Sequence, residues 1–350
     1  MSEKKILMRG NDAIGEGAIR AGCRFYAGYP ITPQNELTGY MAARMREVGG
    51  TFIQAESELA AVSMIFGAST TGARVMTSSS SPGISLKQEG ISYLAGCRLP
   101  SVIVNVMRGG PGLGNIAGAQ SDYFQATKGG GHGDYRLIVL APSSVQEMAD
   151  FTYQAFDLTD KYRTPVMILA DGILGQMSEP LVLPAMRELT FPEKDWALTG
   201  CKNRKPRSIQ SLYLGSGVLE EHNIKLQNTY KEIEKNEVRF KDYLINDAEY
   251  IVVAFGSVAR IARAAVDVLR KQGCKAGLVQ PITLYPFPYN HINEVANKAK
   301  KFLTVEMNMG QMVEDVRIAV FGKAPVEFYG RTAGGIPEVD EIVKRIQCKM

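Results

Sequence analysis

The sequence has few cysteines and no long apolar run, and each absence excludes a class of protein. The five cysteines are an odd number, lie far apart and include no C-x-x-C pair (Cys23, Cys97, Cys201, Cys274, Cys348). This pattern argues against a disulfide framework, and against a zinc site or an iron–sulfur cluster carried by this chain alone. No apolar run approaches the roughly 18 residues that a membrane-spanning helix needs. The first residues also lack the apolar core of a secretory signal. We therefore expect a cytoplasmic protein with no membrane partner.

The sequence also has almost no excess of one sign of charge. The 40 basic and 36 acidic residues leave a formal net charge of +4 on 350 residues. So small an excess does not indicate binding to nucleic acid. The glycine-rich stretches contain no G-x-x-x-x-G-K-[ST] sequence, which excludes a P-loop, and the run from Gly109 to Gly114 fits a dinucleotide fingerprint poorly.

Short apolar runs alternate with helical patterns along the chain. Because these runs are apolar throughout, they predict strands that are covered on both faces, as in parallel α/β sheets. The expected fold is α/β, with two doubly wound parallel-sheet domains. The predicted strands are 24–27, 51–54, 74–77, 102–107, 137–141 and 166–170, then 250–257, 276–280, 302–306 and 326–329. The predicted limits are 1–195 for the first domain, 196–246 for a linker with a long amphipathic helix, and 247–350 for the second domain.

The run Gly28-Tyr29-Pro30-Ile31-Thr32-Pro33 follows the first of these strands. Pro30 and Pro33 fix their own φ angles and push the preceding residues toward extended conformations. A helical pattern begins directly afterwards, so the Thr32 hydroxyl is expected at the end of the sheet. On spacing alone, this segment is either an ordinary strand-to-helix loop or part of a binding site.

An acidic pair, Glu56 and Glu58, follows the predicted strand 51–54. Ser57 is a plausible N-cap, which places Glu58 in the first turn of a helix. A carboxylate there interacts favourably with the helix dipole, by about 0.3–1 kcal/mol. Two interpretations stay open at this point. Glu58 either stabilises the helix only, or is a buried acid that forms a hydrogen bond with a ring nitrogen of a cofactor.

Three further loops carry polar groups to the ends of predicted strands. The serine-rich segment 77–83 offers hydroxyls and free backbone N–H groups to a polar ligand, although such loops are common. Arg108 follows the strand 102–107, where a guanidinium could hold a substrate carboxylate or simply precede a surface loop. His132, in a second glycine-rich loop, could contact a ligand, and a simple turn is as plausible there.

Taken together, the motifs 28–33, Glu56-Ser57-Glu58 before Gly67, 77–83, Arg108-Gly109-Gly110-Pro111, 131–134 and 140–142 resemble the alpha subunit of 2-oxoacid:ferredoxin oxidoreductases. The resemblance implies a thiamine diphosphate pyrimidine-binding domain followed by a transketolase C-terminal-like domain. It implies that Glu58 is catalytic and contacts N1′ of the aminopyrimidine. It also implies that Thr32 and Arg108 bind the substrate, and that Tyr29, Pro30, Ser81 and Gly83 help to bind the cofactor.

The resemblance further implies partners, because this sequence has no G-D-G motif for diphosphate and magnesium. A beta subunit is expected to carry that site, with Mg²⁺ and iron–sulfur clusters on partner chains. A gamma subunit and a small ferredoxin-like subunit are also expected. The implied reaction converts a 2-oxoacid and coenzyme A to acyl-CoA and CO₂ while ferredoxin is reduced.

The substrate and the class of function leave alternatives open. We favour a branched-chain acid of the 2-oxoisovalerate type over 2-oxoglutarate. A nicotinamide-dependent dehydrogenase would need a glycine fingerprint that the sequence lacks. If the chain were a non-catalytic docking scaffold, changes at Arg108 and Thr32 would leave the kinetics of the complex unchanged.

Overall fold

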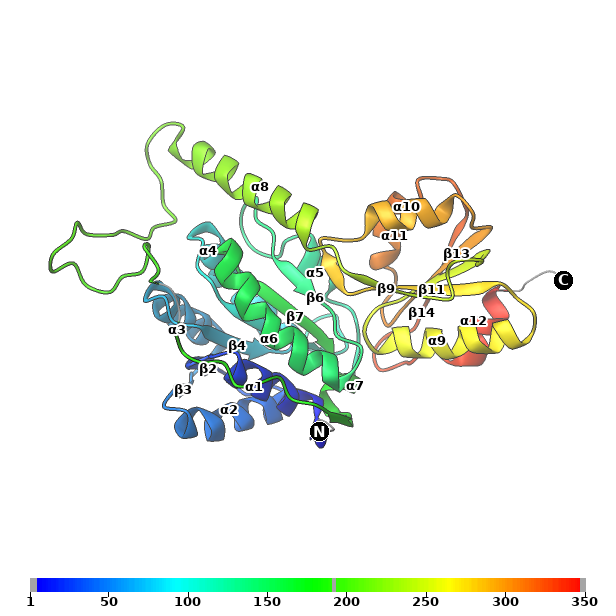
Figure 1. Ribbon diagram of the computed structural model, residues 1–350, viewed down its shortest axis with the longest axis horizontal. Helices are drawn as coiled ribbons and strands as arrows, with labels where there is room; N and C mark the ends of the chain where they lie inside the picture. The colour runs from blue at the N-terminus through cyan, green and yellow to red at the C-terminus, as the bar shows by residue number, and fades with distance from the viewer. Residues whose placement is uncertain (1–4, 191–192, 347–350) are drawn as a thin grey trace.

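Two α/β units make up the molecule in the computed structural model, which describes residues 5–190 and 193–346 (Figure 1). Within those residues, the first unit has a seven-stranded sheet in the order β12-β6-β7-β5-β4-β2-β3. All neighbouring strands in it are parallel except β12, which is antiparallel to β6. The strands are β2 (Phe25–Gly28), β3 (Thr51–Gln54), β4 (Val75–Ser79), β5 (Val102–Met107), β6 (Ile138–Leu140), β7 (Val166–Asp171) and β12 (Thr283–Tyr285).

The second unit has a five-stranded sheet in the order β14-β13-β10-β11-β9, counted over the same described residues. Only β9 runs antiparallel to its neighbour, β11. The strands are β9 (Phe240–Tyr243), β10 (Tyr250–Val253), β11 (Ala276–Pro281), β13 (Lys301–Glu306) and β14 (Val326–Gly330). A separate antiparallel pair is formed by β1 (Ile6–Arg9) and β8 (Ser178–Leu181).

Helices cover the sheets on both sides (Figure 1). In the first unit α1 packs on α6 and α2, and α3 packs on α4. The helices of this unit are α1 (Gly10–Arg20), α2 (Asn35–Glu47), α3 (Glu58–Thr70), α4 (Ser81–Gly96), α5 (Tyr123–Thr127), α6 (Val145–Tyr162) and α7 (Gly172–Gln176). Those that follow are α8 (Val218–Asn236), α9 (Gly256–Lys271), α10 (Tyr289–Ala296), α11 (Met312–Val320) and α12 (Val339–Ile346).

The predicted fold class is confirmed, and the antiparallel edge strands are the features that the apolar runs did not reveal. The segment 283–285, downstream of the connector, joins the sheet of the first unit, and 240–243 joins the sheet of the second. The long helix expected between the two units is present as α8, which ends at Asn236. Cys274 takes part in a disulfide bond, which the spacing of the cysteines did not predict.

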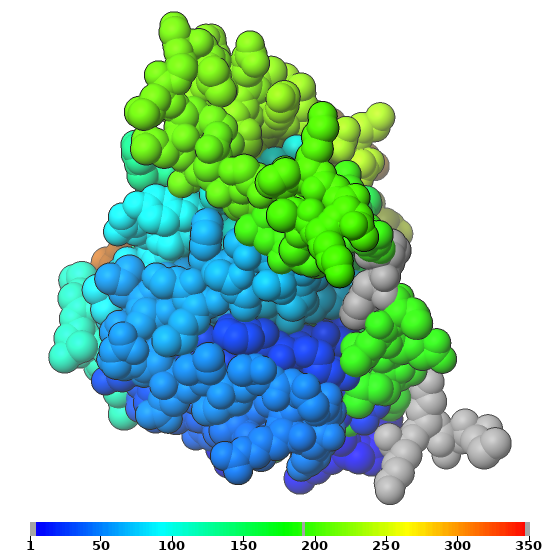
Figure 2. Space-filling model, turned by 90° about the vertical axis from the view of Figure 1, so that its left-hand side faces the viewer, coloured from blue at the N-terminus to red at the C-terminus, as the bar shows by residue number. Residues whose placement is uncertain are grey.

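The connector 198–217, before α8, is mostly exposed and projects from the body of the molecule (Figure 1). Figure 2 shows it, in green, above the blue helices of the first unit. His222 of α8 ties the helix to the end of α4 through a hydrogen bond of 2.6 Å to the backbone carbonyl oxygen of Gly96. No helix in the described part of the chain is long and apolar enough to cross a membrane.

Candidate active site

The amino end of α4 is the point at which the predicted site residues meet. The helix follows the carboxyl end of β4, and its first turn lies between α3 on one side and the end of β5 on the other. Parallel α/β sheets bind ligands at this edge, because the loops that follow the strands gather there. Glu58, Arg108, Ser81 and Gly83 all lie along this edge, on α3, the loop after β5 and α4.

Glu58 opens α3 as the sequence predicted. Ser57 is the N-cap, and its hydroxyl accepts a hydrogen bond of 3.1 Å from the backbone N–H of Ala60. Glu58 is nevertheless buried, with 6% of its surface exposed, whereas Glu56 is exposed. A carboxyl group that only capped the dipole would gain from facing water, so burial favours a role in binding.

The backbone of Gly83 packs directly against the Glu58 side chain. A Cβ atom at this position would lie 2.5 Å from Oε1 of Glu58 and would collide with Oγ of Ser79. The absence of a side chain therefore lets the first turn of α4 approach the Glu58 carboxyl group closely.

Two buried serine hydroxyls between β4 and α4 have no partner in the described part of the chain. Oγ of Ser79 and Oγ of Ser80 accept and donate no hydrogen bond within residues 5–190 and 193–346. A buried hydroxyl without a partner costs about 1–3 kcal/mol, so two of them together indicate a place where a polar ligand binds. The sequence analysis named Ser81 instead, and the run of four serines was the signal for all of them.

Ser81 is already occupied by contacts within the chain. Its hydroxyl donates to Oδ2 of Asp122 at 2.5 Å and accepts from the backbone N–H of Arg108 at 3.0 Å. Asn105 donates to the same Asp122 oxygen at 2.9 Å. Burial raises the pKa of Asp122, while the hydrogen bonds from Ser81 and Asn105 oppose that rise. The side chain of Ser81 therefore joins α4 to β5 and is less available to a ligand than Ser79 or Ser80.

Arg108 and Thr32 come together although 76 positions separate them. Nη1 of Arg108 donates to the backbone carbonyl oxygen of Thr32 at 3.0 Å, and Nη2 donates to that of Leu113 at 2.9 Å. The guanidinium is 6% exposed, its Nε has no hydrogen-bond partner, and no carboxylate of the described residues pairs with it. A buried cation held only by neutral carbonyl groups suits an anionic ligand such as a carboxylate.

Lys87 is a buried residue that the sequence analysis missed. Its side chain is fully buried on α4, and Nζ donates to Oγ1 of Thr77 at 2.6 Å and to the backbone carbonyl oxygen of Ser78 at 2.9 Å. Burial lowers the pKa of Lys87 to about 7, and the charge of Glu58 opposes that shift. Its position four residues after Gly83 was the available signal, because residues i and i+4 share a helix face.

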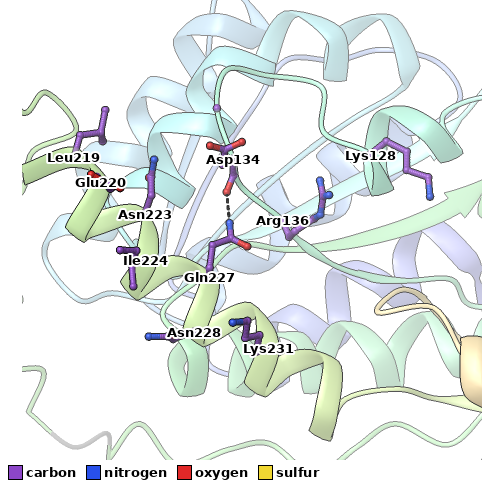
Figure 3. Close-up of a pocket in the computed structure, with 11 residues that line it drawn as sticks. Lys128, Asp134, Arg136, Leu219, Glu220, Asn223, Ile224, Gln227, Asn228 and Lys231 are labelled. Atoms are coloured by element: carbon purple, nitrogen blue, oxygen red, sulfur yellow. Dashed lines mark hydrogen bonds between the residues drawn. The ribbon is translucent and has the colours of Figure 1, made fainter. Parts of the chain in front are cut away.

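Other predicted residues lie at the margin. Tyr29 and Pro30 are exposed on the loop before Thr32. His132 is exposed and lines a pocket with Tyr213 and His222. Next to it, a groove of about 840 Å³ separates the loop that carries Asp134 from α8 (Figure 3). This groove shares no lining residue with the Glu58 site, and no described residue in it was predicted to be catalytic.

Comparison with known proteins decides the family. Residues 16–241 match the pyruvate flavodoxin/ferredoxin oxidoreductase thiamine diphosphate-binding domain. The chain belongs to this family. Residues 248–342 match core domain II of pyruvate:ferredoxin oxidoreductase, so the two units correspond to two recognised domains of these oxidoreductases. The family that the sequence motifs indicated is confirmed.

Individual relatives extend the likeness over the whole chain. The ketoisovalerate oxidoreductase subunit VorB of Methanothermobacter thermautotrophicus is 50% identical over 341 residues, which is 97% of each chain. The 2-oxoglutarate synthase subunit KorA of Methanothermobacter marburgensis is 37% identical over 370 residues, 98% of each chain. Both relatives are named as subunits, so proteins of this kind act in multisubunit oxidoreductases.

A solved structure agrees with the fold. The 2-oxoglutarate:ferredoxin oxidoreductase from Magnetococcus marinus, with 2-oxoglutarate, coenzyme A and succinyl-CoA bound, superposes with a TM-score of 0.87 at 27% identity. The match covers 99% of this chain, which spans 65% of the length of that solved chain.

Proposed function

We propose that this chain is the subunit of a 2-oxoacid:ferredoxin oxidoreductase that binds the aminopyrimidine ring of thiamine diphosphate through Glu58. The observation that carries the proposal is the buried Glu58 carboxyl group, which lies against the backbone of Gly83 at the amino end of α4. The unpartnered hydroxyls of Ser79 and Ser80 provide further hydrogen-bonding groups for a polar ring. These residues fit a flat heterocycle that needs one hydrogen bond to a ring nitrogen.

The residues of this chain would have separate tasks. Bound thiamine diphosphate supplies the nucleophilic carbon and the electron sink for oxidative decarboxylation. Glu58 would hold a proton at the ring nitrogen, in a dry site where hydrogen bonds are strong. Arg108 would bind the substrate carboxylate, because its buried guanidinium has no acidic partner among the described residues. Thr32, whose backbone carbonyl oxygen accepts a hydrogen bond from Arg108, would help to orient that carboxylate.

We further propose a branched-chain 2-oxoacid of the 2-oxoisovalerate type as substrate, with coenzyme A as co-substrate and acyl-CoA, CO₂ and reduced ferredoxin as products. The support is the identity of 50% to a ketoisovalerate oxidoreductase subunit, against 37% to a 2-oxoglutarate synthase subunit. 2-Oxoglutarate is the competing substrate. The match to a thiamine diphosphate-binding domain gives no support to a nicotinamide-dependent dehydrogenase or a docking scaffold.

The remaining parts of the proposal concern the assembly. A beta subunit would bind the diphosphate and Mg²⁺ and carry an iron–sulfur cluster, and a gamma subunit and a small ferredoxin-like subunit would complete a cytoplasmic complex. The proposed limits within this chain are 1–195 for the pyrimidine-binding domain, 196–246 for the linker and 247–350 for the C-terminal domain.

The test is Glu58→Gln in the assembled complex, with Glu56→Gln as the matched control two positions away. Loss of the ionisable proton should lower 2-oxoacid-dependent ferredoxin reduction by at least about 100-fold, the usual contribution of general acid–base catalysis. The control changes an exposed carboxylate and should keep its activity. Wild-type activity in Glu58→Gln would refute the proposal. The ratio of kcat/KM for 2-oxoisovalerate, pyruvate and 2-oxoglutarate decides the substrate.

A further inference from the structure

Asp122 precedes α5 and carries a carboxylate that the proposed chemistry does not use. Its Oδ2 accepts two hydrogen bonds, one from the hydroxyl of Ser81 at 2.5 Å and one from the side-chain amide of Asn105 at 2.9 Å. Ser81 begins α4, and Asn105 lies on β5. Hydrogen bonds to a charged acceptor are stronger than those between neutral groups. A single oxygen atom of Asp122 therefore holds the start of α4 against the sheet.

Two further hydrogen bonds complete this connection. Oδ1 of Asn105 accepts from the backbone N–H of Ser81 at 3.1 Å, and the hydroxyl oxygen of Ser81 accepts from the backbone N–H of Arg108 at 3.0 Å. An ionised carboxylate can only accept, so Asp122 takes the hydroxyl proton of Ser81 and leaves the oxygen of that hydroxyl to Arg108. In the same way it takes the amide N–H of Asn105 and turns the amide oxygen toward Ser81. Asp122 thus orients both side chains.

The two ends of this connection carry the groups of the proposed site. The first turn of α4 includes Gly83, where a Cβ atom would lie 2.5 Å from Oε1 of Glu58. At the other end, Arg108 carries the buried guanidinium that we assign to the substrate carboxylate. A misplacement of about 1 Å in such groups can cost about 100-fold in rate. The cofactor end and the substrate end therefore depend on the same carboxylate.

The second unit holds the backbone on both sides of Asp122. Nε2 of Gln311, the residue before α11, donates to the backbone carbonyl oxygen of Ser121 at 2.7 Å. Its Oε1 accepts from the backbone N–H of Phe124 at 2.8 Å. Because one side-chain amide makes both hydrogen bonds, the position of Asp122 follows the position of α11.

We propose that Asp122 is a positioning residue, which fixes the first turn of α4 and the backbone of Arg108 relative to the second unit. The inference rests on the proposed function, because Asp122 acts only through the groups around Glu58 and Arg108. Its consequence is that the contact made by Gln311 is transmitted to both ends of the site through one carboxylate.

The experiment measures the dissociation constant of thiamine diphosphate and the KM for the 2-oxoacid in the assembled complex. Asp122→Ala removes both hydrogen bonds and should raise each constant by about tenfold. Asp122→Asn keeps an oxygen that can accept from Ser81 and Asn105, and both constants should stay within about threefold of wild type. Asp150→Ala on α6 is the matched control and should leave both constants unchanged. That partly buried carboxylate also accepts two hydrogen bonds, both from Gln146 at 3.0 Å.

A merely structural aspartate predicts another result. Asp122→Ala would then melt at a lower temperature, yet the complex that assembles would keep the wild-type constants, and this outcome would overturn the proposal. Equal losses in Asp122→Asn and Asp122→Ala would also overturn it, because the charge and not the geometry of the hydrogen bonds would then decide. If Asp122→Ala does not assemble, Ser81→Ala breaks the same connection from the side of α4 and should raise both constants in the same way.

Gln311→Ala tests the link to the second unit. Loss of its two hydrogen bonds should raise the same two constants, and adding Gln311→Ala to Asp122→Ala should produce no further rise, since both changes loosen one connection. Effects that multiply in the double variant would show that Gln311 acts by another route and would overturn this link. Failure of the proposed function is a separate outcome, namely an active Glu58→Gln complex.

Discussion

Lys87 links the stability of the chain to pH. Its pKa is about 7 in the folded protein and has the ordinary value of 10.5 when the side chain is exposed. Between these values the unfolded chain binds more protons, so the free energy of unfolding due to this group rises with pH from about 7 to about 10.5. The rise is at most about 1.4 kcal/mol per pH unit.

Lys87→Met should abolish that contribution. The difference in unfolding free energy between Lys87→Met and wild type should favour the variant at pH 7 and shrink toward pH 10, as measured by urea unfolding of the full chain. Using a difference cancels other groups that titrate in the same range, such as Cys23, whose pKa burial raises to about 12. Lys271→Met, which changes an exposed lysine at the end of α9, should show no such trend. A constant difference across this range would mean that Lys87 titrates normally.

Arg108 provides a second prediction at the scale of the residue. Lysine keeps the charge but lacks the planar fork that reaches two carbonyl groups and a carboxylate together. We expect Arg108→Lys to raise KM for the 2-oxoacid by at least about tenfold, the equivalent of about 1.4 kcal/mol. The KM for coenzyme A should stay within about twofold. Arg46→Lys, at an exposed position on α2, is the control. Equal KM values in both variants would exclude Arg108 from substrate binding.

The close contact of α3 and α4 is tested by glycine replacement. Gly83→Ala places a methyl group against Ser79 and Glu58, whereas Gly67→Ala, on α3, meets nothing within 4 Å. Alanine in a helix is favoured over glycine by about 0.5–1 kcal/mol, so Gly67→Ala should raise the melting temperature slightly. Gly83→Ala should lower it, and should weaken thiamine diphosphate binding by more than tenfold. Tight cofactor binding by Gly83→Ala would show that the ring does not depend on the position of Glu58.

The sequence predicted those strands and helix ends that are determined by residues close together in the chain. The apolar runs gave the parallel strands, and Ser57 gave the start of α3, because a cap depends on neighbours within one turn. The edge strands β9 and β12 were not predicted. Each is only a few residues long and is stabilised by pairing with a distant segment. The occupied side chain of Ser81 and the buried Lys87 were missed for the same reason. Their partners, Asp122 for Ser81 and the end of β4 for Lys87, lie on other elements of the fold.

At the scale of the whole molecule, the second unit holds the loop that follows Arg108. Asn115 donates to the backbone carbonyl oxygen of Ala333 at 2.8 Å, and the hydroxyl of Tyr123 donates to Asp315 at 2.6 Å. Gln120 is fully buried between the units. These contacts hold the segment from Asn115 to Tyr123 against the second unit. We therefore expect the second unit to restrain the loop that follows Arg108.

Gln120→Ala tests this anchoring. The amide Nε2 of Gln120 donates to the backbone carbonyl oxygen of Phe255 at 2.9 Å, and its Oε1 accepts from the backbone N–H of Met307 at 3.1 Å. Truncation leaves both backbone groups buried and unpaired, at about 1–3 kcal/mol each. The free energy of unfolding should fall by at least about 2 kcal/mol, and KM for the 2-oxoacid should rise because the loop after Arg108 is less restrained.

Gln227→Ala is the matched control, because Gln227 is exposed on α8 and donates only to the backbone carbonyl oxygen of Asp134, at 2.9 Å. Its unfolding free energy should change by less than about 0.5 kcal/mol. Both variants are compared by urea unfolding and by the dependence of ferredoxin reduction on 2-oxoacid concentration. Loss of stability in Gln120→Ala with an unchanged KM would show that the second unit supports the fold but does not restrain the loop. A KM that rises together with the loss of stability in Gln120→Ala, with both unchanged in Gln227→Ala, is the result expected if the same contacts serve both.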